Sequence, residues 1–408
     1  KYVDLAYEMG WSYYIMDEGW QPRSQVAGKR YDGYYEWFDG MVEYAAERGV
    51  GLVAWILAHD LDTPEELAVL AEYAEKGIVG IKVDFFDIDD QDTIELYKKI
   101  YEECAKHGLI VNCHGANKPT GEARTYPNVI NREAVAGQEF GGINTYQSTF
   151  WPFARNVVGP MDITPHVVAA GGTEARMNAL FVMFESGMPC IASSAEQVQA
   201  SPAYSLLKGL PSAWDEIHYI DGYPGEFATL ARRSGENWYA ASINGNTQTR
   251  TARFPLDFLT DGEEYCAIIY RDDMSNSRLT VEYKVVTSAD TLEIEMLKNG
   301  GCTVKIQPLV EGMEIEMESE LTLKLGESAA LNAVIAPEEF ADTDIIWTTS
   351  DGSVASVADG VVTAEGIGAA MVTATSSINP MVSASAVVLI EGQKYVPADG
   401  WTIDNPSA

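Results

Sequence analysis

The sequence has little positive charge and few cysteines, and each scarcity excludes a class of protein. Its 27 Lys and Arg residues stand against 61 Asp and Glu residues, which gives a formal net charge of −34. This charge would repel nucleic-acid phosphates and anionic membrane surfaces, so we exclude both as partners. The five cysteines include no Cys-x-x-Cys pair, which argues against a zinc site and a disulfide scaffold. We expect buried free thiols instead.

Long apolar runs are also absent. No stretch is long enough to span a membrane, and no signal peptide is visible at the start. The first seven residues have a helical pattern without a cap before them, so we interpret the chain as a fragment. The negative charge fits a neutral substrate such as a sugar, and carboxylates could also hold Ca²⁺. Nine Trp and 21 Tyr residues supply flat rings of the kind that sugar sites use, although most such rings pack in cores.

The length of 408 residues predicts two or three domains. Through residues 1–217, helical segments that end in Gly are followed by apolar strands, as at Gly10, Gly49, Gly77 and Gly108. This alternation predicts βα units and a parallel sheet. The seven candidate strands are residues 12–16, 51–57, 78–84, 109–113, 128–132, 157–161 and 189–193. A (β/α)8 TIM-type barrel needs eight strands, so we predict a catalytic barrel whose first strand would precede Lys1.

Beyond residue 217 the pattern changes to short strands separated by turns. We predict an antiparallel β-sandwich domain at 218–308 and a second, immunoglobulin-like β-sandwich at 309–393. The phrase Trp-Thr-Thr-Ser-Asp at 347–351 resembles bacterial immunoglobulin-like repeats of the group 2 type. That resemblance implies a secreted or cell-surface bacterial protein and attachment to the cell surface or to polysaccharide. Residues 394–408 form a tail or the start of a further module.

Two acidic strand ends carry the main chemical signal. The predicted strand 78–84 ends in Asp84, and a second acid-rich strand end carries Glu133 and Glu139. Parallel α/β barrels display catalytic groups at the carboxyl ends of their strands. Either acid alone could be a solvated loop or helix-start residue. Two carboxylates from different strand ends, in an aromatic-rich chain, suggest cleavage of a glycosidic bond.

Six phrases, in this order, closely resemble glycoside hydrolase family 97 over residues 1 to about 305. They are Asp-Glu-Gly-Trp at 17–20, Lys-Val-Asp-Phe at 82–85, His-Gly-Ala-Asn at 114–117, Tyr-Pro-Asn at 126–128, the stretch 132–139, and Gly-Pro-Met-Asp at 159–162. The resemblance implies an N-terminal β-sandwich, a catalytic barrel and a C-terminal β domain. The first of these, with the first barrel strand, is absent from this sequence.

The resemblance also implies roles for the acids. Inverting members, which are α-glucosidases, carry a Glu base directly after the His of the His-Gly-Ala phrase, where this chain has Gly115. Retaining, α-galactosidase-like members carry an Asp nucleophile that Asp84 matches, and Glu139 matches the acid/base. The chain therefore resembles the retaining branch. In that chemistry Asp84 would stay ionised beside Lys82 and attack the sugar, while Glu139 would donate a proton and then activate water.

Cofactor and substrate contacts follow from the same resemblance. Glu133 and Glu139 match the family's Ca²⁺ ligands, and further ligands come from the absent sandwich.

Five residues are candidates for binding the oligosaccharide or glycan substrate. Glu18 and His114 match sugar-hydroxyl contacts, and His59 ends the predicted strand 51–57. Trp20 could stack on a sugar ring or pack in the core. Lys82 could contact substrate or be a snorkelling strand-end residue.

Three alternatives stay open. One is a retaining enzyme for a related sugar such as a β-L-arabinopyranoside. Another is an α-glucosidase that inverts with an unidentified base. The third, from a different class, is a non-catalytic carbohydrate-binding or adhesion protein. The presence of both Asp84 and Glu139 argues against the third, because a binding protein needs no acid/base pair.

Overall fold

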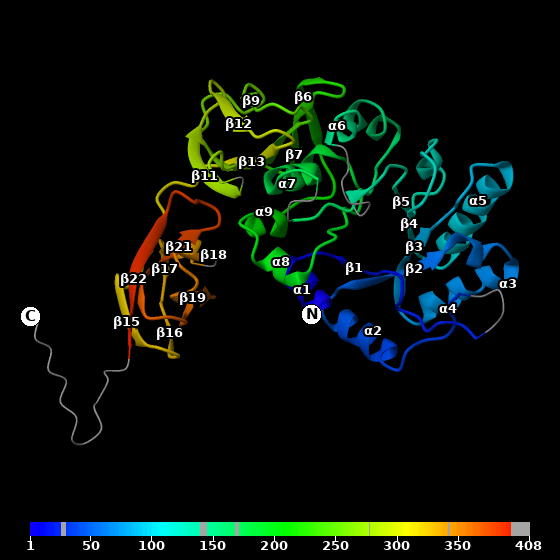
Figure 1. The fold of residues 1–408 in the computed structure, drawn as a ribbon, viewed down its shortest axis with the longest axis horizontal. Helices are drawn as coiled ribbons and strands as arrows, with labels where there is room; N and C mark the ends of the chain where they lie inside the picture. Colours follow the sequence, from blue (N-terminus) through cyan, green and yellow to red (C-terminus); the bar gives the residue numbers. More distant parts are fainter. Residues whose placement is uncertain (26–29, 139–144, 168–170, 277, 342, 393–408) are drawn as a thin grey trace, which may run out of the picture. The chain divides into compact units, whose positions relative to one another are not determined.

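The computed structural model describes residues 1–25, 30–138, 145–167, 171–276, 278–341 and 343–392 (Figure 1). The chain divides into two compact units. The first comprises residues 1–263 and 267–306, and the second comprises residues 264–266 and those from 307 onward. Cys104, Cys113, Cys266 and Cys302 are buried free thiols, as expected, and Cys190 is half-buried. None of the helices in the described residues has the length and apolar character needed to traverse a bilayer.

A five-stranded parallel sheet organises the first half of the first unit. Its strands, in order, are β1 (Tyr13–Met16), β2 (Gly51–Leu57), β3 (Ile78–Asp84), β4 (Ile110–Cys113) and β5 (Val129–Arg132). Five of the seven predicted strands are thereby confirmed. β2 and β3 are buried along almost their whole length, as apolar runs in a parallel sheet require.

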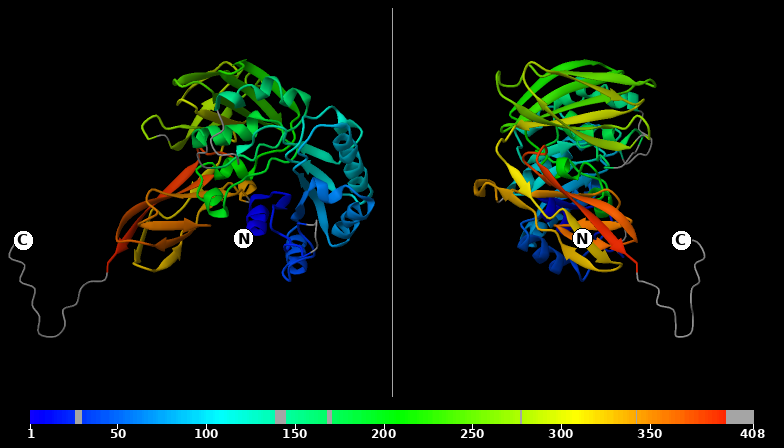
Figure 2. Two further views of the ribbon diagram at one scale, coloured as in Figure 1. Left: turned by 45° about the vertical axis from the view of Figure 1, so that its right-hand side comes forward. Right: turned by 90° about the vertical axis from the view of Figure 1, so that its left-hand side faces the viewer.

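Helices connect these strands and pack against them (Figure 2). They are α1 (Tyr2–Met9), α2 (Phe38–Glu47), α3 (Pro64–Leu67), α4 (Val69–Glu75) and α5 (Gln91–Lys106), with 3₁₀ turns η1 (Ala58–Leu61) and η2 (Glu122–Arg124). Local sequence explains their ends. Thr63 and Glu66 form a capping box at the start of α3, and Gly10 ends α1 in the left-handed conformation at φ 70°.

The predicted strands at 157–161 and 189–193 are wrong. Residues 156–158 form the 3₁₀ turn η5 (Asn156–Val158), and 189–193 have no regular structure. In this region, hydrogen bonds from side chains to the backbone are formed in place of the backbone hydrogen bonds of paired strands. Asn131 Nδ2 donates to Met188 O at 2.8 Å, and Arg155 Nη1 donates to Gly159 O at 2.9 Å. In the part of the chain that is described, the parallel sheet therefore does not close into a barrel.

An antiparallel sheet follows, as predicted for this part of the sequence. Its order is β11-β10-β13-β8-β7-β6, and β9 pairs separately with β12. The strands are β6 (Glu216–Tyr223), β7 (Phe227–Ser234), β8 (Asn237–Asn244), β9 (Arg250–Pro255), β10 (Tyr265–Asp272), β11 (Leu279–Val286), β12 (Thr291–Met296) and β13 (Gly301–Pro308). The helices and 3₁₀ turns before it are α6 (Thr145–Ser148), η4 (Trp151–Phe153), α7 (Glu174–Met183), α8 (Ala195–Gln199) and α9 (Tyr204–Lys208). α7 packs against β7 and β8, and nearly all its side chains are buried.

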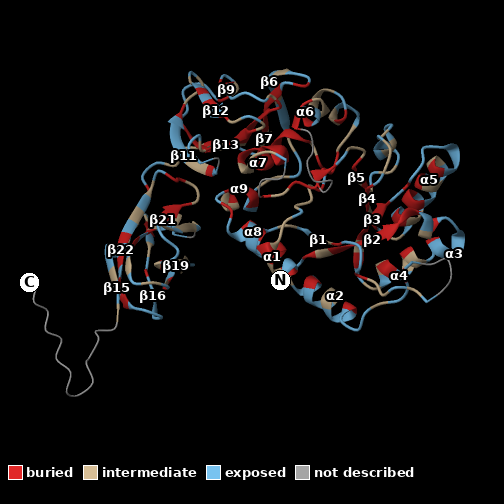
Figure 3. Ribbon diagram, in the orientation of Figure 1, coloured by how far each residue is buried: buried red, intermediate tan, exposed pale blue. Residues whose placement is uncertain are grey.

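The second unit is built from short strands around its own apolar core (Figure 3). Its sheets have the orders β15-β22-β21-β18, β16-β20-β19 and β14-β17. The elements are β14 (Glu314–Glu316), β15 (Glu320–Lys324), β16 (Ser328–Ala330), β17 (Val334–Ala336), η6 (Glu338–Phe340), β18 (Ile345–Thr349), β19 (Ala355–Ala358), β20 (Val361–Ala364), β21 (Gly368–Ser376) and β22 (Ser383–Glu391). Buried and exposed residues alternate along β22, which is the pattern of a sandwich strand.

Candidate active site

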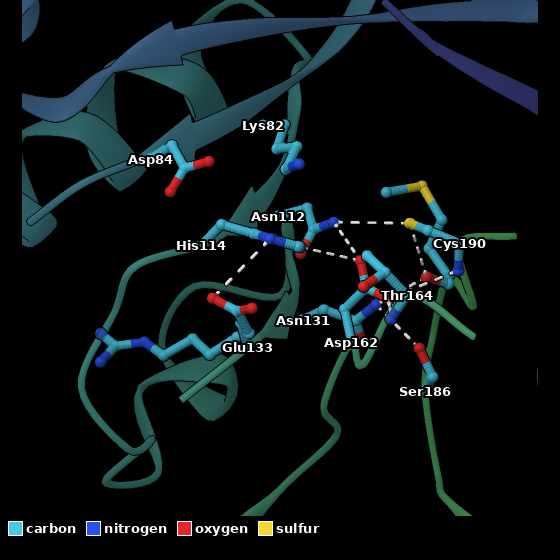
Figure 4. Close-up of polar contacts among 12 residues, drawn as sticks. Lys82, Asp84, Asn112, His114, Asn131, Glu133, Asp162, Thr164, Ser186 and Cys190 are labelled. Atoms are coloured by element: carbon cyan, nitrogen blue, oxygen red, sulfur yellow. Dashed lines mark hydrogen bonds and ion pairs between the residues drawn. The ribbon is translucent and has the colours of Figure 1, made fainter. Parts of the chain in front are cut away.

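The carboxyl ends of β3, β4 and β5 bring the predicted residues together. β3 ends in Asp84, while His114 and Glu133 directly follow β4 and β5. Parallel pairing places Val83 opposite Cys113, and Cys113 opposite Arg132, so the three strand ends meet at one edge. Figure 4 shows the side chains of Lys82, Asp84, His114 and Glu133 gathered there. This edge is where the sequence predicted chemistry.

The carboxylate of Asp84 is held by two donors. Its Oδ2 accepts a hydrogen bond from Trp55 Nε1 at 3.0 Å, and its Oδ1 accepts one from the backbone amide of Phe85 at 2.9 Å. The residue is 9% exposed. A side chain at position 115 would collide with this arrangement, because a Cβ on Gly115 would lie 2.8 Å from Phe85 N and 3.0 Å from Asp84 Oδ1. The absence of a side chain at Gly115 therefore allows the Asp84 carboxylate to occupy this position.

Lys82 supplies a positive charge beside Asp84. Its Nζ lies 2.6 Å from Asp17 Oδ2, and the side chain is almost fully buried. Burial lowers the pKa of Lys82, but the charge and hydrogen bond of Asp17 outweigh it, and Asp84 and Asp162 add to the increase. The net pKa is raised, so the ammonium stays charged near the Asp84 carboxylate.

His114 lies in a buried polar network rather than at an open surface. It is 0% exposed, and its Nε2 lies 2.9 Å from Asp162 Oδ2. Burial raises the pKa of Asp162, but hydrogen bonds from His114, Cys190 and Asn112 outweigh it and lower the pKa to about 2. For His114, burial lowers the pKa, but the hydrogen bond to Asp162 and the charge of Asp162 raise it by more, so the net pKa is raised. Asp162 therefore fixes the orientation of the ring, and the contact between His114 and a sugar hydroxyl stays a prediction.

Glu133 is also buried. Its Oε2 accepts a hydrogen bond from Gly115 N at 2.9 Å and lies 3.8 Å from His114 Nδ1. Arg155 holds the backbone on both sides, donating to Arg132 O at 2.6 Å and to Glu133 O at 3.3 Å. Burial, aided by the Arg132 charge, lowers the pKa of Arg155 to about 10. The Glu133 carboxylate is therefore fixed against the loop that carries Gly115.

The expected calcium site cannot be assembled from the described residues alone. Glu139, predicted as both acid/base and calcium ligand, lies outside them. Within the ranges described, no group of three or more His, Cys, Asp or Glu side chains is arranged to hold a metal ion. Glu133 is one oxygen ligand where Ca²⁺ prefers six to eight.

The remaining predicted contacts differ in their surroundings. Glu18 is partly exposed, forms an ion pair with Arg30 at 2.6 Å and accepts a hydrogen bond from the Tyr31 hydroxyl. His59, in η1, has a side chain that is 60% exposed. Trp20 is 5% exposed, and its Nε1 donates to Trp55 O at 2.7 Å. Its ring packs among Tyr34, Phe38 and Tyr73, so Trp20 packs in the core, the second of the two roles considered for it.

Sequence reasoning missed Trp55 as a partner of Asp84 and Asp17 as the partner of Lys82. Register offered a signal for both. Trp55 pairs with Lys82 across β2 and β3, so its side chain shares a face with Lys82 and Asp84. Asp17 directly follows β1, at the same edge of the sheet as Asp84.

Three regions of the chain match protein-family models. Residues 1–135 match the model described as Glycoside hydrolase 97, and residues 213–307 match the one described as Glycosyl-hydrolase 97 C-terminal, oligomerisation. Residues 310–386 match Bacterial Ig-like domain (group 2).

Curated relatives and a solved structure are also similar. A protein from Streptomyces bingchenggensis named "Probable retaining alpha-galactosidase" is 36% identical over 319 residues, covering 74% of this chain and 48% of the relative. A "Retaining alpha-galactosidase" from Bacteroides thetaiotaomicron is 32% identical over 336 residues, covering 75% and 50%. A Glycoside Hydrolase Family 97 enzyme from Pseudoalteromonas sp. strain K8, solved in complex with acarbose, has a TM-score of 0.68 at 26% identity, covering 76% of this chain and 55% of that one. The chain spans about half the length of the curated relatives it matches.

Proposed function

We propose that this chain, which belongs to glycoside hydrolase family 97, carries the nucleophile of a retaining glycosidase that cleaves terminal α-galactosides. The carboxylate of Asp84 carries the proposal. Trp55 Nε1 and the Phe85 amide donate to its two oxygens at 3.0 and 2.9 Å, which gives it one orientation at the end of β3. A nucleophile needs such an orientation toward the anomeric carbon. The names of the two curated relatives support the galactoside substrate.

Position 115 supports retention over inversion. An inverting enzyme needs a second carboxylate that activates water on the face opposite the leaving group. The family resemblance would put that base directly after His114, where this chain has Gly115. A side chain there would press on Phe85 N and Asp84 Oδ1, so the fold favours a nucleophilic Asp84 over a base at 115.

The proposed reaction has two displacement steps. First, a carboxylate oxygen of Asp84 forms an ester bond to the anomeric carbon. The bond to the leaving-group oxygen breaks, and that oxygen takes a proton from the general acid, for which Glu139 is the candidate. Water then attacks the same carbon and gives a proton to the same acid/base, and Asp84 leaves as a carboxylate. Two inversions give net retention.

Proton NMR of an α-galactoside mixed with the protein that contains this chain tests the proposal. Early release of α-galactose is expected. Early β-galactose would contradict retention and the role of Asp84. Cleavage of an α-glucoside instead would keep the family and replace the substrate. Binding of sugar without any hydrolysis would favour a non-catalytic carbohydrate-binding protein.

We further propose that the parallel sheet belongs to a (β/α)8 barrel. A cavity of about 700 Å³ lies between β1 and residues 187–193. Tyr13 and Ile15 line one side, and Pro189 and Ile191 line the other. β1 is the terminal strand of the order β1-β2-β3-β4-β5, so a further strand in this cavity would pair with it as a sixth, which leaves two more strand positions of the proposed barrel.

Calcium binding and location are proposals from resemblance. We propose that Glu133 and Glu139 are calcium ligands, completed by residues outside this chain.

We also propose that the bacterial Ig-like region attaches a secreted or cell-surface enzyme to the cell surface or to polysaccharide. Deleting residues 309–393 should abolish sedimentation with polysaccharide or cell envelope without reducing hydrolysis of a small galactoside. Unchanged sedimentation would contradict the attachment role.

A further inference from the structure

Phe85, the residue after Asp84, is exposed in a conformation that a bulky side chain seldom adopts. Phe85 is 48% exposed, and its φ of 60° lies in the left-handed region. Strained backbone of this kind persists only where its surroundings impose it, and it clusters at functional sites. Here the Phe85 amide donates to Asp84 Oδ1 at 2.9 Å, and the next amide, of Phe86, donates to Gly115 O at 3.1 Å. The backbone is therefore fixed on both sides.

The exposure of Phe85 does not reflect a loose segment. Phe86 is 4% exposed, and its ring stacks on Tyr97 with centroids 3.8 Å apart. Two consecutive phenylalanines thus have opposite environments, one in the core and one in solvent. The exposed ring of Phe85 lies beside the proposed nucleophile, so a bound substrate that covers it would gain the stabilisation of burial.

Phe85 is the most exposed of three rings that contact one another in series, Tyr31, Trp55 and Phe85, which we call the aromatic arc. The ring of Trp55 contacts the rings of Phe85 and Tyr31 edge-to-face, with centroids 6.5 Å and 6.0 Å apart. Trp55 and Tyr31 are 3% and 7% exposed, so they support Phe85 and cannot themselves offer a face. Because Trp55 Nε1 also donates to Asp84 Oδ2, the arc and the nucleophile share one rigid contact.

We propose that Phe85 is a substrate-binding residue, on whose exposed face the apolar C–H face of a pyranose ring stacks. The inference deepens the proposed function and rests on it. A flat ring held by the arc would bind such a face without losing conformational freedom. It would stabilise the bound substrate and the transition state alike, and therefore act mainly on binding.

The test compares Phe85→Ala and Phe85→Trp with the wild-type protein on α-galactosides. Phe85→Ala should raise KM about tenfold with kcat within about twofold, and Phe85→Trp should keep KM near wild type. In an Asp84→Asn background, calorimetry should show the same tenfold loss of affinity for the intact galactoside. Tyr7→Ala, which removes a 63% exposed ring on α1, is the matched control and should change neither quantity.

Phe85→Gly separates substrate binding from folding. Glycine adopts φ 60° without strain, so this variant should melt at a higher temperature than Phe85→Ala and yet bind sugar as weakly. Unchanged KM in both variants would overturn the inference, as would a fall in kcat with KM unchanged, which would mean that Phe85 acts only through Asp84. If the wild-type protein cleaves no α-galactoside, the proposed function itself fails and this inference falls with it.

Discussion

Trp55 Nε1 lies 3.0 Å from Asp84 Oδ2, across the register that pairs β2 with β3. Trp55 is buried, and its backbone carbonyl in turn accepts a hydrogen bond from Trp20 Nε1 at 2.7 Å. The orientation of the proposed nucleophile is thus fixed from inside the core. This relationship explains why an indole occupies a strand position that an aliphatic side chain could otherwise fill.

Replacing Trp55 with Phe should lower kcat/KM on α-galactosides by about 10- to 100-fold, because a hydrogen bond to a charged oxygen is lost while most of the ring volume stays. Steady-state kinetics checks this. Trp11→Phe is a matched control. Trp11 Nε1 donates a hydrogen bond of 3.2 Å to Leu207 O, and this contact does not involve the strand ends that carry the site. Equal losses in both variants would show that the effect is general destabilisation.

Gly115→Ala should lower both stability and activity. Gly115 has φ 49°, and a Cβ there would lie 2.8 Å from Phe85 N. We expect a loss of about 3 kcal/mol in the free energy of unfolding, and a fall in kcat because the Asp84 carboxylate must move. Gly49→Ala is the control: Gly49 has φ 68° with no atom within 4 Å of its Cβ position, so it should lose about 1 kcal/mol and no activity. Denaturant unfolding compares the two, and similar losses would contradict the steric argument.

The sequence predicted the strand ends better than the contacts made there. The apolar run to Asp84 and the glycine helix caps are local signals, and β3 ends where predicted. The segments 157–161 and 189–193, predicted as strands, lie beside backbone that side chains bond instead. Arg155 donates to Gly159 O from four residues away, but Asn131 donates to Met188 O from 57 residues away, which no local pattern reveals.

Individual site residues were harder to predict for the same reason. The sequence around a Trp that follows a strand, such as Trp20, is the same whether the side chain faces a sugar or the core. Its neighbours decide, and they come from α2 and α4. The pairing of His114 with Asp162 was not predicted, because Asp162 is 48 residues away in the sequence. Pairings of this kind depend on the tertiary fold.

Asp84→Ala should abolish turnover of α-galactosides, since no other group would form the glycosyl ester. External azide should restore activity and release β-galactosyl azide, because it attacks the face that Asp84 vacates. Chromatography with NMR identifies the product. Asp92→Ala, at an exposed carboxylate in the first turn of α5, serves as the control and should be fully active. Full activity in Asp84→Ala would sink the proposed mechanism.

Chelation tests the proposed calcium ligands. If Glu133 and Glu139 bind Ca²⁺ near the sugar, EDTA should lower activity at least about tenfold, and added Ca²⁺ should restore it. Calorimetric titration of the chelated protein with Ca²⁺ should show a site that Glu133→Gln weakens. Glu122→Gln changes a carboxylate that is paired with Arg132 instead, and it should leave calcium affinity unchanged. Activity unaffected by EDTA, with no heat of binding, would remove calcium from the site.

Asp162→Asn should change how stability depends on pH. The folded-state pKa of Asp162 is lowered from 3.8 to about 2, so ionised Asp162 stabilises the fold above about pH 4 and loses this contribution as pH falls toward 2. The shift corresponds to about 2 kcal/mol at neutral pH. The raised pKa of His114 adds stability below its unfolded value near 6.5 and loses it as pH rises past the folded value. The wild-type free energy of unfolding should therefore fall between pH 4 and 2, and Asp162→Asn should be less stable at pH 5 with a flatter profile below it. Urea unfolding across this range measures both, and parallel profiles for the two proteins would mean that the Asp162–His114 pair does not set acid stability.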